Sequence, residues 1–179
     1  MKMIKYALVA GLLTSSLMAA GPYVGLDMGR VDVDYKAAGT SSSVDDTGVT
    51  LKGGYYFNQN NRVYAFYQYV DPNVDNASFK QYGVGYDYLI GEGPLKPFVG
   101  VMIGRANSKV NNIHDNFDIS GTLVGVQGGV SYSFNSNVSI EAGYRYIDYT
   151  GADAYESVDG VNVEATSAQN WFAGLNFKF

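Results

Sequence analysis

The sequence has no cysteine and a single histidine among its 179 residues. The lack of cysteine excludes a disulfide framework, a thiolate metal site and a cysteine nucleophile, and one histidine excludes a metal centre built on several imidazoles. Charged residues make up only 16% of the chain, below the roughly 25% of an ordinary soluble domain. The net charge is −5, so the basic surface that nucleic-acid binding requires is also missing.

Long apolar runs are absent too. No stretch after the first twenty residues approaches the ~18 consecutive apolar residues of a transmembrane helix. The first twenty residues combine two lysines, Lys2 and Lys5, with a short apolar run and then small residues ending at Ala20. This is the order of regions in a secretory signal peptide. We therefore expect residues 1–20 to be a signal peptide that is cleaved off, and residues 21–179 to form one mature domain.

What the sequence does contain is aromatic residues and glycine, with 16 Tyr, 9 Phe and 22 Gly. From residue 21 onward, apolar side chains recur at every second position in eight segments, which indicates β-strands with one apolar face. In segment 62–70 the phase is ambiguous, and we assign Val63, Ala65, Tyr67 and Tyr69 to the outside. The connections alternate between short ones at 58–61, 91–94 and 135–137 and longer ones at 37–46, 71–78, 107–120 and 151–167. This alternation predicts an all-β, eight-stranded antiparallel up-and-down barrel.

Two features place the apolar face on the outside, as in a membrane barrel. The polar phase is rich in glycine, which weakens a solvated strand but suits the inside of a narrow barrel. The outward aromatic residues form two sets, one near each end of the strands, like the interfacial girdles of a transmembrane barrel. The set near the short connections is Phe57, Tyr86, Tyr88, Tyr132, Phe134, Phe177 and Phe179, and the set near the long connections is Tyr67, Tyr69, Tyr82, Tyr144, Tyr146 and Trp171. A secreted, lipocalin-like barrel is the alternative.

Charged residues in the polar phase are then predicted to lie inside the barrel. They are three acids and three bases: Asp27, Asp87, Glu141, Lys52, Arg145 and Lys178. Because a buried charge is costly unless it is paired, a balanced set suits a closed, polar and partly wet interior. We expect Glu141 and Lys178 to pair, since they fall at similar heights on adjacent strands. The alternative is that each of them meets water in the lumen.

Three stretches resemble a known family: KPFVGVMIGRA (Lys96–Ala106), EAGYRYIDY (Glu141–Tyr149) and the ending GLNFKF. They are similar to the small outer-membrane β-barrels, which include the transmembrane domain of OmpA and short porin-like proteins. The resemblance implies an integral protein of the bacterial outer membrane, surrounded by outer-membrane lipid and lipopolysaccharide. It also implies that the alternating residues Trp171, Leu175, Phe177 and Phe179 are the signal read by the outer-membrane assembly machinery. The periplasmic domain of OmpA has no counterpart, so wall tethering is not expected.

Three functions follow from this interpretation. We expect a barrel without catalytic activity, cofactor or metal, which serves envelope integrity or surface interaction through four extracellular loops. A narrow diffusion channel for small solutes is the alternative. A lipid A-modifying enzyme is the third, but His114, with Asp115 and Ser120 nearby, shows no spacing that demands a catalytic set. Acidic residues such as Asp45 and Asp46 cluster in the long connections without the spacing of a calcium loop, which is typical of solvated loops.

Overall fold

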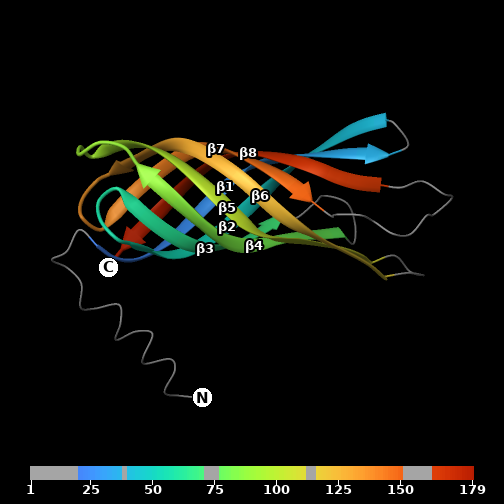
Figure 1. Ribbon diagram of the computed structural model, residues 1–179, viewed down its shortest axis with the longest axis horizontal. Coiled ribbons are helices and arrows are strands. Elements are labelled where there is room, and N and C mark those ends of the chain that lie inside the picture. The colour runs from blue at the N-terminus through green and yellow to red at the C-terminus, as the bar shows by residue number, and fades with distance from the viewer. Residues whose placement is uncertain (1–19, 38–39, 71–76, 112–115, 151–162) are drawn as a thin grey trace, which may run out of the picture.

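The computed structural model describes residues 20–37, 40–70, 77–111, 116–150 and 163–179, and these residues form eight β-strands (Figure 1). The strands are β1 (Gly21–Ala37), β2 (Thr40–Tyr56), β3 (Asn61–Val70), β4 (Ala77–Leu89), β5 (Leu95–Asn111), β6 (Asn116–Ser133), β7 (Val138–Thr150) and β8 (Val163–Lys178). Each strand pairs antiparallel with the next, and β1 also pairs with β8, so the sheet closes into a barrel. The predicted fold class is confirmed. Within the described part of the chain, no helix has the length and apolar character needed to cross a membrane.

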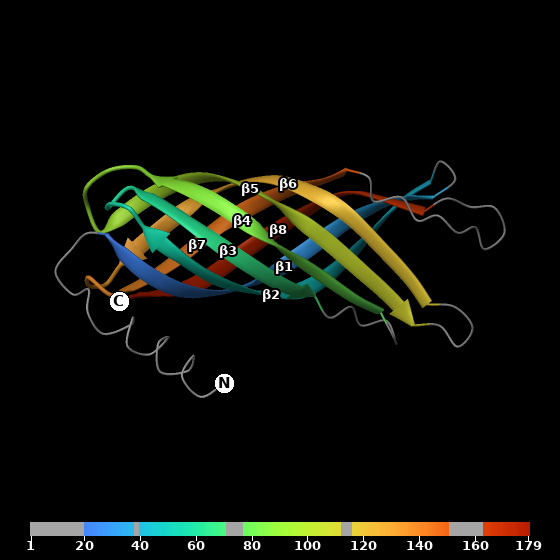
Figure 2. The same ribbon diagram turned by 60° about the horizontal axis from the view of Figure 1, so that its bottom comes forward.

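The strands run obliquely around the long axis of the barrel (Figures 1 and 2). At one end, which we call the short-turn end, tight connections join β2 to β3, β4 to β5 and β6 to β7, and the C-terminus lies there as well. At the other end, which we call the loop end, β1 passes to β2, β3 to β4, β5 to β6 and β7 to β8. The expected signal peptide lies outside the described residues.

The short turns are held by asparagine side chains, as the sequence between the strands suggests. The Asn58 side-chain oxygen accepts a hydrogen bond from the backbone N–H of Asn60 at 2.8 Å, and Asn135 does the same for Asn137 at 2.8 Å. This is the Asx turn, in which the side chain supplies the acceptor that a backbone turn would otherwise need. Gly91 has a φ of 99°, a backbone conformation that glycine adopts without strain.

The strands extend further toward the loop end than the sequence pattern predicts. The β1–β2 pairing continues to Ala37 opposite Thr40, and the β5–β6 pairing continues to Asn111 opposite Asn116. The expected connections 37–46 and 107–120 are therefore largely strand, which corrects the prediction. The physical reason is that backbone hydrogen bonds extend a hairpin whatever its side chains are, whereas the apolar–polar alternation is needed only where one face meets lipid and the other faces the lumen.

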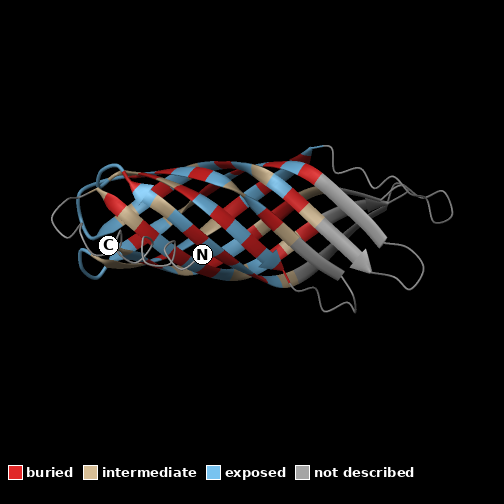
Figure 3. Ribbon diagram, turned by 90° about the horizontal axis from the view of Figure 1, so that it is seen from below, coloured by how far each residue is buried: buried red, intermediate tan, exposed pale blue. Residues whose placement is uncertain are grey.

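Buried and exposed residues alternate along the strands, as predicted (Figure 3). In β1, Leu26 and Met28 are exposed while Tyr23 and Asp27 are buried. In the ambiguous strand β3, every second residue from Arg62 to Val70 is buried, which confirms the outward assignment of Val63, Ala65, Tyr67 and Tyr69. Both predicted aromatic sets lie in the outward phase.

Candidate functional site

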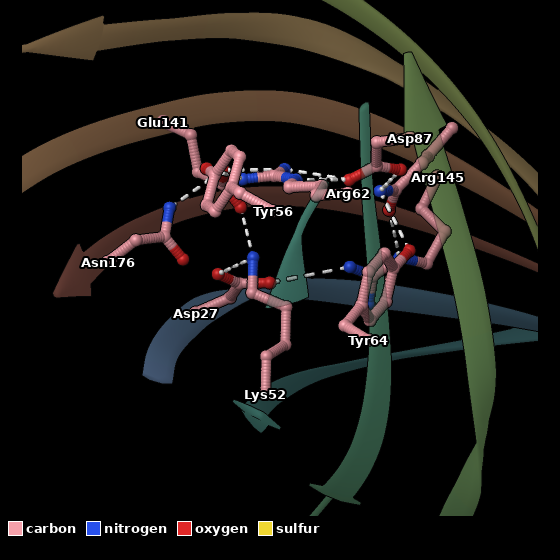
Figure 4. Close-up of polar contacts among 10 residues, drawn as sticks. Asp27, Lys52, Tyr56, Arg62, Tyr64, Asp87, Glu141, Arg145 and Asn176 are labelled. Carbon is pink, nitrogen blue, oxygen red and sulfur yellow. Dashed lines mark hydrogen bonds and ion pairs between the residues drawn. The ribbon is translucent and has the colours of Figure 1, made fainter. Parts of the chain in front are cut away.

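A ring of polar side chains lies inside the barrel (Figure 4). Seven residues form it, in contact order Asp27, Lys52, Glu141, Arg62, Asp87, Gln127 and Arg145, and the last contacts the first again. They come from β1, β2, β3, β4, β6 and β7, and each is at most 5% exposed. Because the sheet is closed, inward side chains of opposite walls meet across the lumen. The polar ring therefore crosses the space that an aqueous channel would need.

Acid and base alternate around most of the polar ring. The Lys52 ammonium lies 2.8 Å from the Asp27 carboxylate and also donates a hydrogen bond to Glu141. The Arg62 guanidinium donates to Glu141 at 2.9 Å and to Asp87 at 2.8 Å. Each of these ions therefore has two oppositely charged partners or a bidentate one, which offsets the large cost of removing a charge from water.

Gln127 closes the remaining gap in the polar ring, between Asp87 and Arg145. Its side-chain nitrogen donates to the Asp87 carboxylate at 2.7 Å, while its side-chain oxygen accepts from the Arg145 guanidinium at 3.0 Å. Arg145 returns to Asp27 through a longer contact of 3.4 Å. An amide both donates and accepts, so it can link an anion and a cation that lie too far apart to touch.

Further polar groups and aromatic side chains contact the members of the polar ring. Tyr56 accepts a hydrogen bond from Arg62 at 3.0 Å, and Asn176 donates to Glu141 at 2.8 Å. The guanidinium of Arg62 lies 5.3 Å from the centre of the Phe98 ring, and that of Arg145 lies 4.7 Å from the Phe172 ring. Contacts of this kind stabilise a cation that water does not reach. With Phe98 on β5 and Asn176 on β8, all eight strands contribute to the site.

Five of the six interior charges expected from the sequence lie in the polar ring: Asp27, Lys52, Asp87, Glu141 and Arg145. The sixth predicted interior charge, Lys178, lies nearer the short-turn end, where its ammonium is 5.6 Å from the centre of the Tyr56 ring. The expected pair of Glu141 with Lys178 is wrong, because the structure gives Glu141 the partners Lys52, Arg62 and Asn176. Asn176 and Lys178 share the inward phase of β8, and Asn176 is the one that reaches the carboxylate.

Two members of the polar ring were not predicted, Gln127 and Arg62. Arg62 is fully buried and contacts both Asp87 and Glu141. It is the second residue of the strand whose phase was ambiguous, close to a short turn. The signal was nevertheless present, because placing Val63 outside places its neighbour Arg62 inside. With Arg62 in the ring, three bases face three acids, so the predicted balance of interior charge holds with a different member.

An apolar layer lies between the polar ring and the loop end. On β7 the inward residues that follow Arg145 are Ile147 and Tyr149, and on β1 Asp27 is followed by Gly29 and then Val31. Leu123 and Ala168 have no exposed surface, and Val31 and Ile147 are 1% exposed. Gln81 is the polar side chain of this layer that donates to Tyr149, at 2.6 Å. Gln68 and Asn170 are buried at the same level, since they pair with Gln81 and Val31, so this layer is mainly apolar but keeps some polar groups.

A cavity of about 510 Å³ opens at the short-turn end. Its lining includes Ser131, Lys96 and Lys178, together with Tyr56 and Asn176. The last two are the side chains that contact Arg62 and Glu141, so the cavity ends where the polar ring begins.

The described residues show no arrangement of the kind a metal enzyme would need. Among them, no cluster of three or more histidine, cysteine, aspartate or glutamate side chains could hold a metal ion. His114 and Asp115 lie outside the described residues, as do most of the acidic positions in the long connections. The chemistry that can be assigned to the described interior is electrostatic: matched charges and hydrogen bonds that hold opposite walls together.

Comparison with known proteins identifies the family to which this architecture belongs. The model of the outer membrane protein β-barrel domain matches residues 6–179, and the chain belongs to this family. It is therefore an integral protein of the bacterial outer membrane, and its class is that of the small eight-stranded outer-membrane barrels. In such barrels short turns face the periplasm and the other end faces outward, which orients the short-turn end and the loop end. No curated protein sequence matches the chain.

Three solved structures illustrate the likeness of fold. Neisserial surface protein A has 24% sequence identity and a TM-score of 0.66, with 89% of this chain and 99% of that chain covered. The N-terminal β-barrel domain of Pseudomonas aeruginosa OprF has 15% identity and a TM-score of 0.58 at the same coverage. Ail, the attachment invasion locus protein of Yersinia pestis, has 18% identity and a TM-score of 0.53, again at that coverage. At these identities the likeness shows the fold alone.

Proposed function

We propose that the protein is a non-conducting barrel that acts at the cell surface rather than through its lumen. The observation that carries this proposal is the closed polar ring, which joins β2 to β7 through Lys52 and Glu141 and β3 to β7 through Arg62 and Glu141. An ion could pass only by separating buried pairs, and breaking one such pair costs about 3–5 kcal/mol. The mainly apolar layer on the loop-end side of the ring adds a second barrier, because its few polar side chains, such as Gln81, carry no charge that could replace the water around an ion.

Planar-bilayer recordings test the closed lumen. Protein purified from outer membranes should insert without discrete current steps, and protease protection of the barrel should prove the insertion. A variant in which Arg62→Ala and Glu141→Ala remove the centre of the polar ring should, if it folds, be the first to conduct. Reproducible steps from the unmodified protein would instead favour the alternative, a narrow diffusion channel, and Lys52→Gln should then change its ion selectivity.

For the role itself we propose envelope integrity or surface interaction through the long connections at the loop end. A rigid wall that presents variable connections is a common way to place a binding surface. Two similar structures carry names of this kind, a surface protein and an attachment invasion protein, and the latter was solved with a heparin analogue. The barrel thus would act as a scaffold, with its specificity in the residues that join the strands.

Two strains separate these roles. One lacks the protein, and the other carries the barrel with residues 151–162 replaced by a short glycine–serine turn. If the connections bind a surface, both strains should lose adhesion to glycan-coated plates while the second keeps normal resistance to detergent. If the barrel supports the envelope, only the deletion strain should become sensitive to detergent.

His114→Ala should leave the lipid A of the strain unchanged, since we propose no catalytic activity, and a loss of modified lipid A would overturn this.

A further inference from the structure

An apolar groove of about 640 Å³ crosses the outside of the wall over β2 to β6. Gly53, Ala65, Val84 and Ile103 lie along it, and each pairs with the next across neighbouring strands. Gly53 and Ala65 are the smallest residues of this row, so the groove is deepest there, while larger outward residues such as Tyr86 border it. In the membrane this groove faces the acyl chains of the bilayer.

Two cations stand at the loop-end side of the groove, on the strands that line it. Arg105 is two residues beyond Ile103 on β5, and Lys80 is four residues from Val84 on β4. Arg105 pairs with Tyr82, and Lys80 pairs with Tyr69, so both cations lie within the outer aromatic girdle. This girdle marks the boundary between hydrocarbon and headgroups, here in the outer leaflet.

Lys80 and Arg105 can act on one group. Lys80 pairs with Asn107, two residues from Arg105, so the two cations are diagonal neighbours on one face, about 7–8 Å apart. Among the described residues no ion pair includes either of them, whereas Arg30, an outward cation on the far strand β1, lies 3.5 Å from Asp32. Two long basic side chains at this spacing suit a phosphate, which arginine binds through paired hydrogen bonds.

We propose that the groove and the two cations together form one lipid site. The phosphorylated headgroup of an outer-leaflet lipid would lie between Lys80 and Arg105, and an acyl chain of the same molecule would fill the groove at Gly53 and Ala65. The apolar groove and the basic pair are independent features. Along β4 and β5 the cations lie nearer the loop end than the groove, just as the headgroup of such a lipid lies nearer the membrane surface than its acyl chain. This inference concerns the outer wall and does not rest on whether the lumen conducts.

Native mass spectrometry of protein purified in mild detergent tests the site. The probes are lipid A carrying its phosphates and the same lipid with the phosphates removed. The headgroup variant is Lys80→Gln with Arg105→Gln, and its matched control is Arg30→Gln. The groove variant is Gly53→Leu, since a side chain there would meet open space. Its control is Gly128→Leu, at an outward glycine of β6 whose nearest neighbour would be an ordinary contact at 3.6 Å.

We expect the phosphorylated lipid to bind at least about tenfold more tightly than the dephosphorylated one, the factor that one charge-assisted hydrogen bond supplies. The headgroup variant should remove this difference and Arg30→Gln should keep it. Gly53→Leu should weaken both lipids, and Gly128→Leu neither. A band shift on unheated gels shows that each variant is folded.

Three results would overturn the proposal. Equal losses in the headgroup variant and in Arg30→Gln would mean a general attraction of the girdle for anionic lipid. Complete displacement of the lipid by inorganic phosphate would mean that the acyl chain contributes nothing. If Gly53→Leu abolished a cross-linked dimer and left lipid binding unchanged, the groove would be a contact between two copies of the chain.

Discussion

The two faces of the barrel wall obey different rules, and Gly53 and Gly54 show the contrast within one strand. A methyl group added at Gly53 would meet nothing within 4 Å, whereas one added at Gly54 would overlap the carbonyl oxygen of Val63. Gly53 faces lipid, which adapts its shape to any side chain, and Gly54 faces a lumen that is filled up to the backbone. The outer wall therefore needs only to be apolar, while each inner position must fit a particular neighbour.

The largest expected effect comes from removing a charge from the inner face. Arg62→Met leaves Asp87 and Glu141 without the cation that both of them contact, and it should lower the free energy of unfolding by about 3–5 kcal/mol. Urea unfolding in lipid vesicles, followed by the fluorescence of Trp171, the only tryptophan, measures this. Combining Arg62→Met with Asp87→Asn should recover part of the loss. A single variant as stable as the unmodified protein would show that the polar ring contributes no net stability.

Adding a charge to the outer face should have a somewhat smaller effect. Val126 lies opposite Val101 in the middle of the lipid-facing wall and is exposed to the bilayer. An arginine near the mid-plane of a membrane barrel costs about 2–4 kcal/mol, so Val126→Arg should destabilise the barrel by that amount in the same unfolding assay. Val126→Leu is the control and should be nearly neutral. Equal stability of the two variants would mean that this position does not face hydrocarbon.

The smallest change, one methyl group, compares the faces most directly. Gly54→Ala should cost about 1–3 kcal/mol, because the inner face has no room and the backbone must shift. Gly53→Ala should change the stability by less than about 0.5 kcal/mol, as is usual for positions without special contacts. The difference between the midpoints of unfolding of the two variants is the measurement. If both alanines were tolerated equally, the inner face would be looser than the polar ring implies.

Much of the fold could be predicted because alternate residues of each strand in a membrane barrel face lipid and lumen, and so differ in polarity. Leu26 and Met28 on one side of β1, and Asp27 between them, were enough to assign both faces of that strand. The two sets of outward aromatic residues were predicted from the same alternation. The strand ends toward the loop end could not be predicted, since Ala37 opposite Thr40 and Asn111 opposite Asn116 are paired by backbone hydrogen bonds that leave no pattern in the side chains.

The sequence predicted which residues form the candidate site better than it predicted which of them contact each other. Five charges of the polar ring were identified from their phase alone, and the same rule would have found Arg62 had the phase of β3 been clear. Proximity along the sheet suggested Lys178 as the partner of Glu141, but the partners came from across the lumen, on β2 and β3. The apolar layer around Leu123 and Ile147 was missed, because a valine or leucine near a strand end reads the same whether it faces lipid or lumen.

The sequence by itself determined that the chain is an eight-stranded barrel, which face of most strands meets lipid, and five of the six charges of the polar ring. These are properties of local periodicity and composition, which closure of the sheet does not alter. Only the tertiary structure decided which charges meet, since Lys52 and Glu141 are 89 residues apart and approach because the wall curves round to bring β2 opposite β7. It also decided that Lys80 and Arg105 stand above one groove, because strand register, which a hydrophobic pattern fixes only to within two residues, sets their diagonal.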